Sequence, residues 1–126
     1  MGQKLKKPEM VVVDTLADYH NLIQGDKVVV KVGADWCPPC HVQNEKIEDL
    51  DYDRVKDIKF AEVDADSFEL SELFDEMGIK AIPTLVLYHK GNVLTKSTGI
   101  KGGWELYELF KAFDDDYKPE DAKTEV

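Results

Sequence analysis

The hydrophobic residues of this chain fall into short runs separated by polar segments. Five runs rich in valine and other strand-forming residues predict β-strands. They are Met10 to Val13, Val28 to Val32, Ile58 to Val63, Thr84 to Tyr88 and Val93 to Ser97. The second run is apolar at almost every position, which predicts a central strand, buried on both faces and parallel to a neighbour. The last two runs flank Lys90-Gly91-Asn92 and predict an antiparallel hairpin.

Apolar residues at helical spacing lie between these strands and after the last one. The first predicted helix is capped by Asp14 and ends at Gly25, and the second continues from the two cysteines toward Val55. The third runs from Ser67 to Gly78. The last helix places four apolar residues on one face, namely Leu106, Leu109, Phe110 and Phe113. The order β-α-β-α-β-α-β-β-α predicts an α/β domain, with a central mixed sheet of about five strands flanked by about four helices.

The length of 126 residues suits one domain. We expect it to cover residues 10–113, after an N-terminal extension of residues 1–9 and before an acidic, disordered tail of residues 114–126. The net charge of −10 argues against binding to nucleic acid or to an anionic membrane surface. The start of the chain has no apolar signal core, so we expect a cytoplasmic monomer, or a mitochondrial one if a presequence has been removed.

The two cysteines are the main chemical signal. Cys37 and Cys40 form one C-x-x-C, which closes too small a ring to stabilise the fold and therefore predicts reversible redox chemistry. Cys37 falls where the helix N-cap is expected, with Pro38 at the first helical position, and the positive end of the helix favours its thiolate. Cys40 shares a face with Ile47 and should point inward. We therefore expect Cys37 to be the accessible nucleophile and Cys40 the resolving thiol.

A C-x-x-C also occurs in metal sites. Zinc requires four ligands, and this chain adds only His20, His41 and His89, with no second clustered pair, so we expect no metal. Two alternatives remain open: an iron–sulfur cluster that bridges two chains, and an interaction module with little turnover.

Two motifs resemble those of the thioredoxin family. They are Trp36-Cys37-Pro38-Pro39-Cys40 after a buried strand, and Ile82-Pro83-Thr84 before the hairpin. The resemblance covers Val11 to Phe113 and implies a thioredoxin fold with protein-disulfide reductase activity. The Pro-Pro insert resembles that of tryparedoxins, although the residues after Cys40 do not.

The resemblance also implies how targets and electrons reach the cysteines. It implies a cis bond between Ile82 and Pro83 and a substrate groove that these residues share with Trp36, Pro38 and Gly99. It implies no bound cofactor, and electrons from a flavoprotein thioredoxin reductase that uses FAD and NADPH, or from a small dithiol such as trypanothione. The expected partners are disulfide-containing proteins such as peroxiredoxins or reductases.

The chain departs from the family pattern beneath the cysteines. Lys31 stands six residues before Cys37, where thioredoxins generally have a buried aspartate. Glu62 aligns with a lysine of bacterial thioredoxins, which predicts a Lys31–Glu62 pair beneath Cys40 that manages its proton. Alternatively, Glu62 is a solvated edge residue. Gly33 replaces a usually large side chain, so we expect a wider space under the site.

Overall fold

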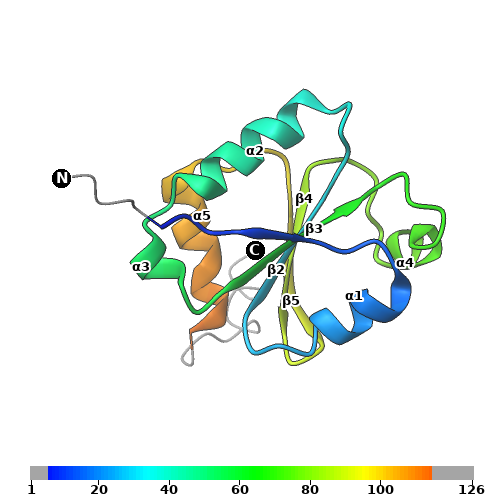
Figure 1. Ribbon diagram of the computed structural model, residues 1–126, viewed down its shortest axis with the longest axis horizontal. Coiled ribbons are helices and arrows are strands. Elements are labelled where there is room, and N and C mark those ends of the chain that lie inside the picture. Colours follow the sequence, from blue (N-terminus) through cyan, green and yellow to red (C-terminus); the bar gives the residue numbers. More distant parts are fainter. Residues whose placement is uncertain (1–5, 115–126) are drawn as a thin grey trace, which may run out of the picture.

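The computed structural model describes residues 6–114, which form one sheet with helices on both faces (Figure 1). The strands are β1 (Met10–Val12), β2 (Val28–Gly33), β3 (Lys59–Asp64), β4 (Thr84–His89) and β5 (Asn92–Thr98). The helices are α1 (Leu16–Leu22), α2 (Pro38–Glu48), α3 (Tyr52–Val55), α4 (Ser71–Glu76), α5 (Gly103–Leu109) and the 3₁₀ helix η1 (Phe110–Phe113). None of these helices is long and apolar enough to cross a membrane. The expectation of a disordered tail falls on residues 115–126, outside the described residues.

The sheet has the strand order β1-β3-β2-β4-β5, with β2 in the middle. β1 and β2 both run parallel to β3, whereas β4 pairs antiparallel with β2 and with β5. All six residues of β2 are buried. The predicted mixed five-stranded sheet, with a central β2 and a terminal hairpin, is therefore confirmed.

Alternate residues of β2 face two separate hydrophobic cores. Val28, Val30 and Val32 pack with side chains of α1 and α4 on one face of the sheet. Val29 packs with side chains of α2, α3, α5 and η1 on the other face. Figure 1 shows this division, with α1 and α4 on one side of the sheet and the remaining helices on the other. Lys31 has the parity of Val29, so its side chain starts on the α2 face.

The start of α1 differs from the prediction. The N-cap is Thr15 and not Asp14, because Thr15 Oγ1 accepts the backbone N–H of Asp18 at 3.1 Å. Both residue types are common N-caps, so the sequence pattern alone does not choose between two adjacent candidates.

Two further helix boundaries were predicted wrongly. The helix expected to reach Val55 ends at Glu48, and Asp51 starts a separate helix by accepting the backbone N–H of Asp53 at 3.1 Å. The helix expected from Ser67 begins at Ser71. In the second case Ser67 Oγ accepts the backbone N–H of Leu70 at 3.3 Å. In both cases a polar side chain thus bonds a nearby backbone N–H, which favours a turn over a continuous helix.

Candidate active site

The cysteines lie at the junction between β2 and α2. Cys37 is the N-cap of α2, Pro38 is the first helical residue, and Cys37 forms a disulfide with Cys40. The backbone N–H of Cys40 donates to Cys37 Sγ at 3.2 Å. The predicted position of Cys37 at the positive end of a helix is therefore confirmed, and this end favours a negative charge on its sulfur.

Exposure does not distinguish the two cysteines in this oxidised form. Cys37 is 3% exposed and Cys40 is 1% exposed, so the expectation that Cys37 is accessible is wrong for the disulfide state. The reason is packing, because both cysteines form a small buried cluster with Ala34, against which Ile82 also packs. The assignment of the nucleophile and the resolving thiol stays a prediction.

Of the predicted groove residues, only Ile82 packs directly against this cluster. The Ile82–Pro83 bond is cis, and the Gly99 N–H donates to the Pro83 carbonyl at 2.8 Å. Trp36 is 66% exposed, and its indole N–H donates to Asp66 Oδ2 at 2.7 Å. Trp36 and Ile82 line one groove, whereas Pro38, Pro83 and Gly99 are not part of its lining. Pro38 is exposed at the start of α2.

Beneath the cysteines, Lys31 and Glu62 form the predicted ion pair. They are register partners on β2 and β3, and Lys31 Nζ lies 3.0 Å from Glu62 Oε1. Lys31 is 3% exposed, and the side chain of Glu62 is 30% exposed. The alternative of a freely solvated Glu62 is therefore wrong.

Gly33 does not leave an enlarged space, contrary to the expectation. A Cβ atom on Gly33 would lie 3.0 Å from Cys40 Sγ and 3.1 Å from Lys31 Cε. These two groups already fill the volume that a side chain at position 33 would need. The missing side chain thus lets the stem of Lys31 pass directly under Cys40, as the predicted placement of the pair requires.

Asn44 is a further residue of the site, one that no sequence motif identified. Its Nδ2 donates to Glu62 Oε1 at 3.3 Å, and its Oδ1 is buried without a hydrogen-bond partner among residues 6–114. Asn44 follows Cys40 by four residues, so both lie on one face of α2. That spacing was the signal that could have identified it.

A pair of phenols is buried on the opposite face of the sheet. The hydroxyls of Tyr19 and Tyr88 lie 2.6 Å apart, and the Tyr88 hydroxyl also donates to Met77 Sδ at 3.6 Å. Burial raises the pKa of both tyrosines above the ordinary value of 10.0; the hydrogen bond raises that of Tyr19 further and lowers that of Tyr88. This pair belongs to the core and does not reach the cysteines.

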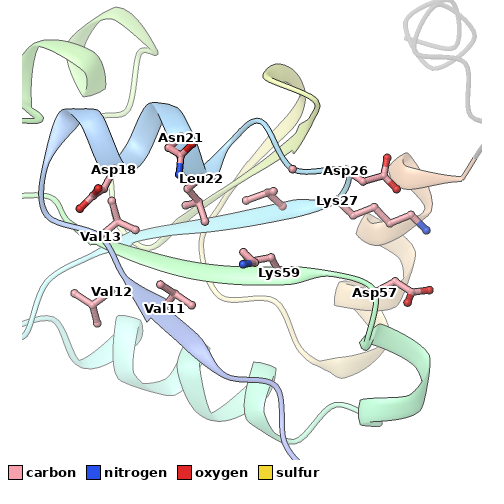
Figure 2. Close-up of a pocket in the computed structure, with 12 residues that line it drawn as sticks. Val11, Val12, Val13, Asp18, Asn21, Leu22, Asp26, Lys27, Asp57 and Lys59 are labelled. Atoms are coloured by element: carbon pink, nitrogen blue, oxygen red, sulfur yellow. The ribbon is translucent and has the colours of Figure 1, made fainter.

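Another groove lies away from the cysteines, between α1 and the β1 edge (Figure 2). It includes Lys27 and Lys59, which stand at the starts of β2 and β3, whereas Cys37 follows the end of β2. Within residues 6–114, no three His, Cys, Asp or Glu side chains are arranged to hold a metal ion.

Residues 10–113 match the family model described as Thioredoxin. The chain is 39% identical over 88 residues to "Thioredoxin-2, mitochondrial" of Schizosaccharomyces pombe, a match that covers 69% of this chain and 64% of that protein, just under two thirds of its length. It is 33% identical over 104 residues to "Thioredoxin Asp f 28" of Aspergillus fumigatus, covering 82% of this chain and 94% of the relative.

The fold also matches solved structures. Oxidised mitochondrial thioredoxin 3 of Saccharomyces cerevisiae superposes with a TM-score of 0.69 at 28% identity, covering 81% of this chain and 93% of that one. This likeness confirms the thioredoxin fold that the motifs implied. With a Cys37–Cys40 disulfide at the expected place in that fold, the chain belongs to the thioredoxin family of thiol–disulfide oxidoreductases.

Proposed function

We propose that this protein is a protein-disulfide reductase in which Cys37 attacks the target and Cys40 releases it. The observation that carries the proposal is the unequal placement of the two sulfurs. Both sulfurs are buried, but Cys37 Sγ is at the N-cap of α2, where it accepts a backbone N–H, whereas Cys40 Sγ packs over Gly33 on the sheet. The helix end and this N–H stabilise a thiolate at Cys37.

The reaction runs in two exchange steps. The Cys37 thiolate attacks one sulfur of a target disulfide, so the target S–S bond breaks, a Cys37–target bond forms, and the other target sulfur leaves as a thiolate that is protonated by solvent. Cys40 then loses its proton and attacks Cys37 Sγ. The Cys37–target bond breaks, the Cys37–Cys40 disulfide forms, and the second target sulfur leaves and is protonated. The target gains the two electrons that the protein loses.

The target is proposed to lie in the groove formed by Trp36, Pro38, Ile82, Pro83 and Gly99. The backbone N–H and C=O of Ile82 have no hydrogen-bond partner within residues 6–114, so they are available to an extended target segment. Such main-chain pairing gives affinity for many sequences, because it does not depend on side chains.

Lys31 and Glu62 are proposed to manage the proton of Cys40. The Glu62 carboxylate accepts that proton when Cys40 attacks, and the Lys31 ammonium stabilises the thiolate as it forms. The packing of both Cys40 Sγ and Lys31 Cε against Gly33 supports this role.

The electrons that return the protein to the dithiol are proposed to come from a flavoprotein thioredoxin reductase with FAD and NADPH. A small dithiol such as trypanothione is the second candidate, because the motif carries the Pro-Pro insert. Peroxiredoxins and reductases with a disulfide are the proposed targets. We propose a cytoplasmic protein, or a mitochondrial one, as in the S. pombe relative.

Insulin reduction with dithiothreitol as electron donor tests the proposed function. We expect the native protein to accelerate insulin precipitation, and the Cys37→Ser variant to give only the rate of dithiothreitol alone. A native protein no faster than dithiothreitol alone contradicts the reductase proposal and leaves an interaction module. Visible absorption and iron analysis of the purified protein test the iron–sulfur alternative.

A further inference from the structure

We propose that Asn44 is a positioning residue for the resolving step, because it holds the Glu62 carboxylate where it can take the proton of Cys40. This inference rests on the proposed function and concerns only its second exchange step. Asn44 Nδ2 donates to Glu62 Oε1 at 3.3 Å, and so connects helix α2, which carries Cys40, with strand β3.

The position of Asn44 on α2 supports this role. It follows Cys40 by one helical turn, and helical side chains lean toward the N-terminus, so the Asn44 amide lies over the turn that carries Cys40. The amide therefore spans the distance between the helix that bears the resolving thiol and the carboxylate on the sheet.

The two hydrogen-bond donors on Glu62 leave one oxygen available. Lys31 Nζ and Asn44 Nδ2 both contact Oε1, at 3.0 and 3.3 Å. Oε2 has no hydrogen bond to the described part of the chain, and it is the oxygen assigned to receive the proton. With two donors on one oxygen, the carboxylate cannot rotate freely, which fixes the direction of Oε2.

The amide of Asn44 is poorly suited to a purely structural role. Its Oδ1 is buried and has no hydrogen-bond partner in residues 6–114. A buried acceptor without a donor lowers stability, and an apolar side chain of similar size would avoid that loss. The hydrogen bond from Asn44 Nδ2 to Glu62 Oε1 explains why an asparagine occupies this position.

Other titratable groups near Cys40 are less suitable bases. On β3, the side chain of Asp64 is exposed and accepts the Asp66 N–H at 2.9 Å. On α2, His41 is exposed, and its Nε2 lies 2.6 Å from the Asp35 carbonyl oxygen. Gln43 on α2 is buried but carries no ionisable group, and its side chain is hydrogen-bonded to the Lys101 backbone at 2.7 and 3.0 Å. Buried Lys31 and half-buried Glu62 therefore remain as the ionisable pair beneath Cys40, with Asn44 hydrogen-bonded to Glu62.

Reaction of the reduced protein with dithiobis(nitrobenzoate) separates the two steps by stopped flow. Attack by Cys37 releases the first thionitrobenzoate, and attack by Cys40 on the resulting mixed disulfide releases the second. We would compare Asn44→Leu and Asn44→Asp with native protein, and use Asn21→Leu on the exposed face of α1 as the matched control.

We expect both Asn44 variants to release the first thionitrobenzoate at the native rate and the second about tenfold more slowly, the effect of one lost hydrogen bond. The acid limb of the second rate's pH profile should move to higher pH, because the carboxylate loses a donor. Asn44→Leu should melt no lower than native protein, and Asn21→Leu should keep both native rates.

Three results would overturn the role of Asn44: native second-step rates in both variants, equal slowing of both steps, or an unmoved pH profile. If Asn44→Leu does not fold, the nearly isosteric Asn44→Asp decides. Failure of the proposed function would look different, because the native protein itself would then not accelerate insulin reduction.

Discussion

Lys31 Nζ and Glu62 Oε1 lie 3.0 Å apart, yet the side chain of Lys31 is 4% exposed and that of Glu62 is 30% exposed. The ammonium is therefore almost fully withdrawn from water, while the carboxylate keeps partial access to it. A buried charge needs a partner, so Lys31 depends on Glu62 more than Glu62 depends on Lys31. This asymmetry allows the two charges to be removed separately.

Lys31→Met keeps an unbranched stem and removes the charge. We expect the free energy of unfolding to stay the same or to rise, because buried ion pairs are often no more stabilising than apolar packing. The rate of disulfide resolution should fall, because the forming Cys40 thiolate loses a nearby cation. Urea unfolding and stopped-flow thiol release measure the two effects.

Charge reversal provides the control for this variant. Lys31→Asp places two carboxylates together and should also resolve slowly, whereas Lys31→Asp with Glu62→Lys restores opposite charges and should recover part of the rate. Native resolution in Lys31→Met would show that the pair is only structural.

Gly33→Ala tests the close packing beneath the cysteines. The new Cβ would lie 3.0 Å from Cys40 Sγ and 3.1 Å from Lys31 Cε, so one of them must move. We expect a loss of about 1–3 kcal/mol in the free energy of unfolding, the usual effect of overpacking. Denaturant unfolding of the oxidised protein measures it.

Gly103→Ala is the matched control, because a Cβ there has no atom within 4 Å. Gly103 lies at the start of α5, where alanine is a better helix former than glycine, so the Gly103→Ala variant should be at least as stable as native protein. In the Lys31→Ala background, Gly33→Ala should lower the free energy of unfolding by less, because the Lys31 stem no longer contacts the new Cβ. Equal stability of Gly33→Ala and native protein would contradict close packing of Gly33 against Cys40 and Lys31.

Cys40→Ser should accumulate mixed disulfides with target proteins, because their release requires the second thiol. Cys37→Ser should accumulate few. Non-reducing gel electrophoresis after incubation with an oxidised peroxiredoxin detects these species. Equal accumulation in both variants would contradict the proposed order, in which Cys37 attacks and Cys40 releases the target.

The buried tyrosines predict an alkaline loss of stability. An unfolded chain ionises tyrosine near pH 10. Since burial raises the pKa of Tyr19 and Tyr88 in the folded protein, above that pH the unfolded chain has released protons that the folded protein retains. The free energy of unfolding should therefore fall as the pH rises above about 10, by up to about 1.4 kcal/mol per pH unit for each tyrosine.

Urea unfolding at a series of pH values from about 8 to about 11.5, on both sides of the ordinary tyrosine pKa, measures how steeply the free energy of unfolding falls with pH. Tyr19→Phe should lose stability at neutral pH, because Tyr88 loses a hydrogen-bond partner, but it should show a shallower alkaline slope. Tyr52→Phe, on α3 across the sheet, should keep the native slope. An identical slope in Tyr19→Phe would exclude this explanation.

Much of the fold could be predicted from local pattern. The valine run of β2 indicated a strand covered on both faces, and the helix after it placed Cys37 at an N-cap. The pairing of Lys31 with Glu62 was predicted from the family resemblance, because Glu62 aligns with a lysine of bacterial thioredoxins, and the register of β2 and β3 confirms it. Burial alone could not give that register, because β2 is buried at all six positions.

Other features depended on distances that a sequence does not contain. Whether Gly33 opens a space depends on how far Cys40 and Lys31 extend into it. The contact of Asn44 with Glu62 depends on how α2 lies over β3. The helix starts depended on which polar side chain caps the backbone. Thr15 and Asp51 each accept a backbone N–H, and so begin helices at places that the sequence pattern did not indicate.

The burial of the oxidised cysteine pair means that its reduction requires local movement of the protein. With Cys37 at 3% exposure and Ile82 packed beside it, any reductant, protein or small dithiol, can attack the sulfur only after this cover has moved. A docked protein can displace Ile82 as it occupies the groove, whereas a small dithiol such as dithiothreitol depends on spontaneous movement of this side chain. Reduction by either kind of donor should therefore become faster when Ile82 is shortened to alanine, and the gain should be larger for the small dithiol.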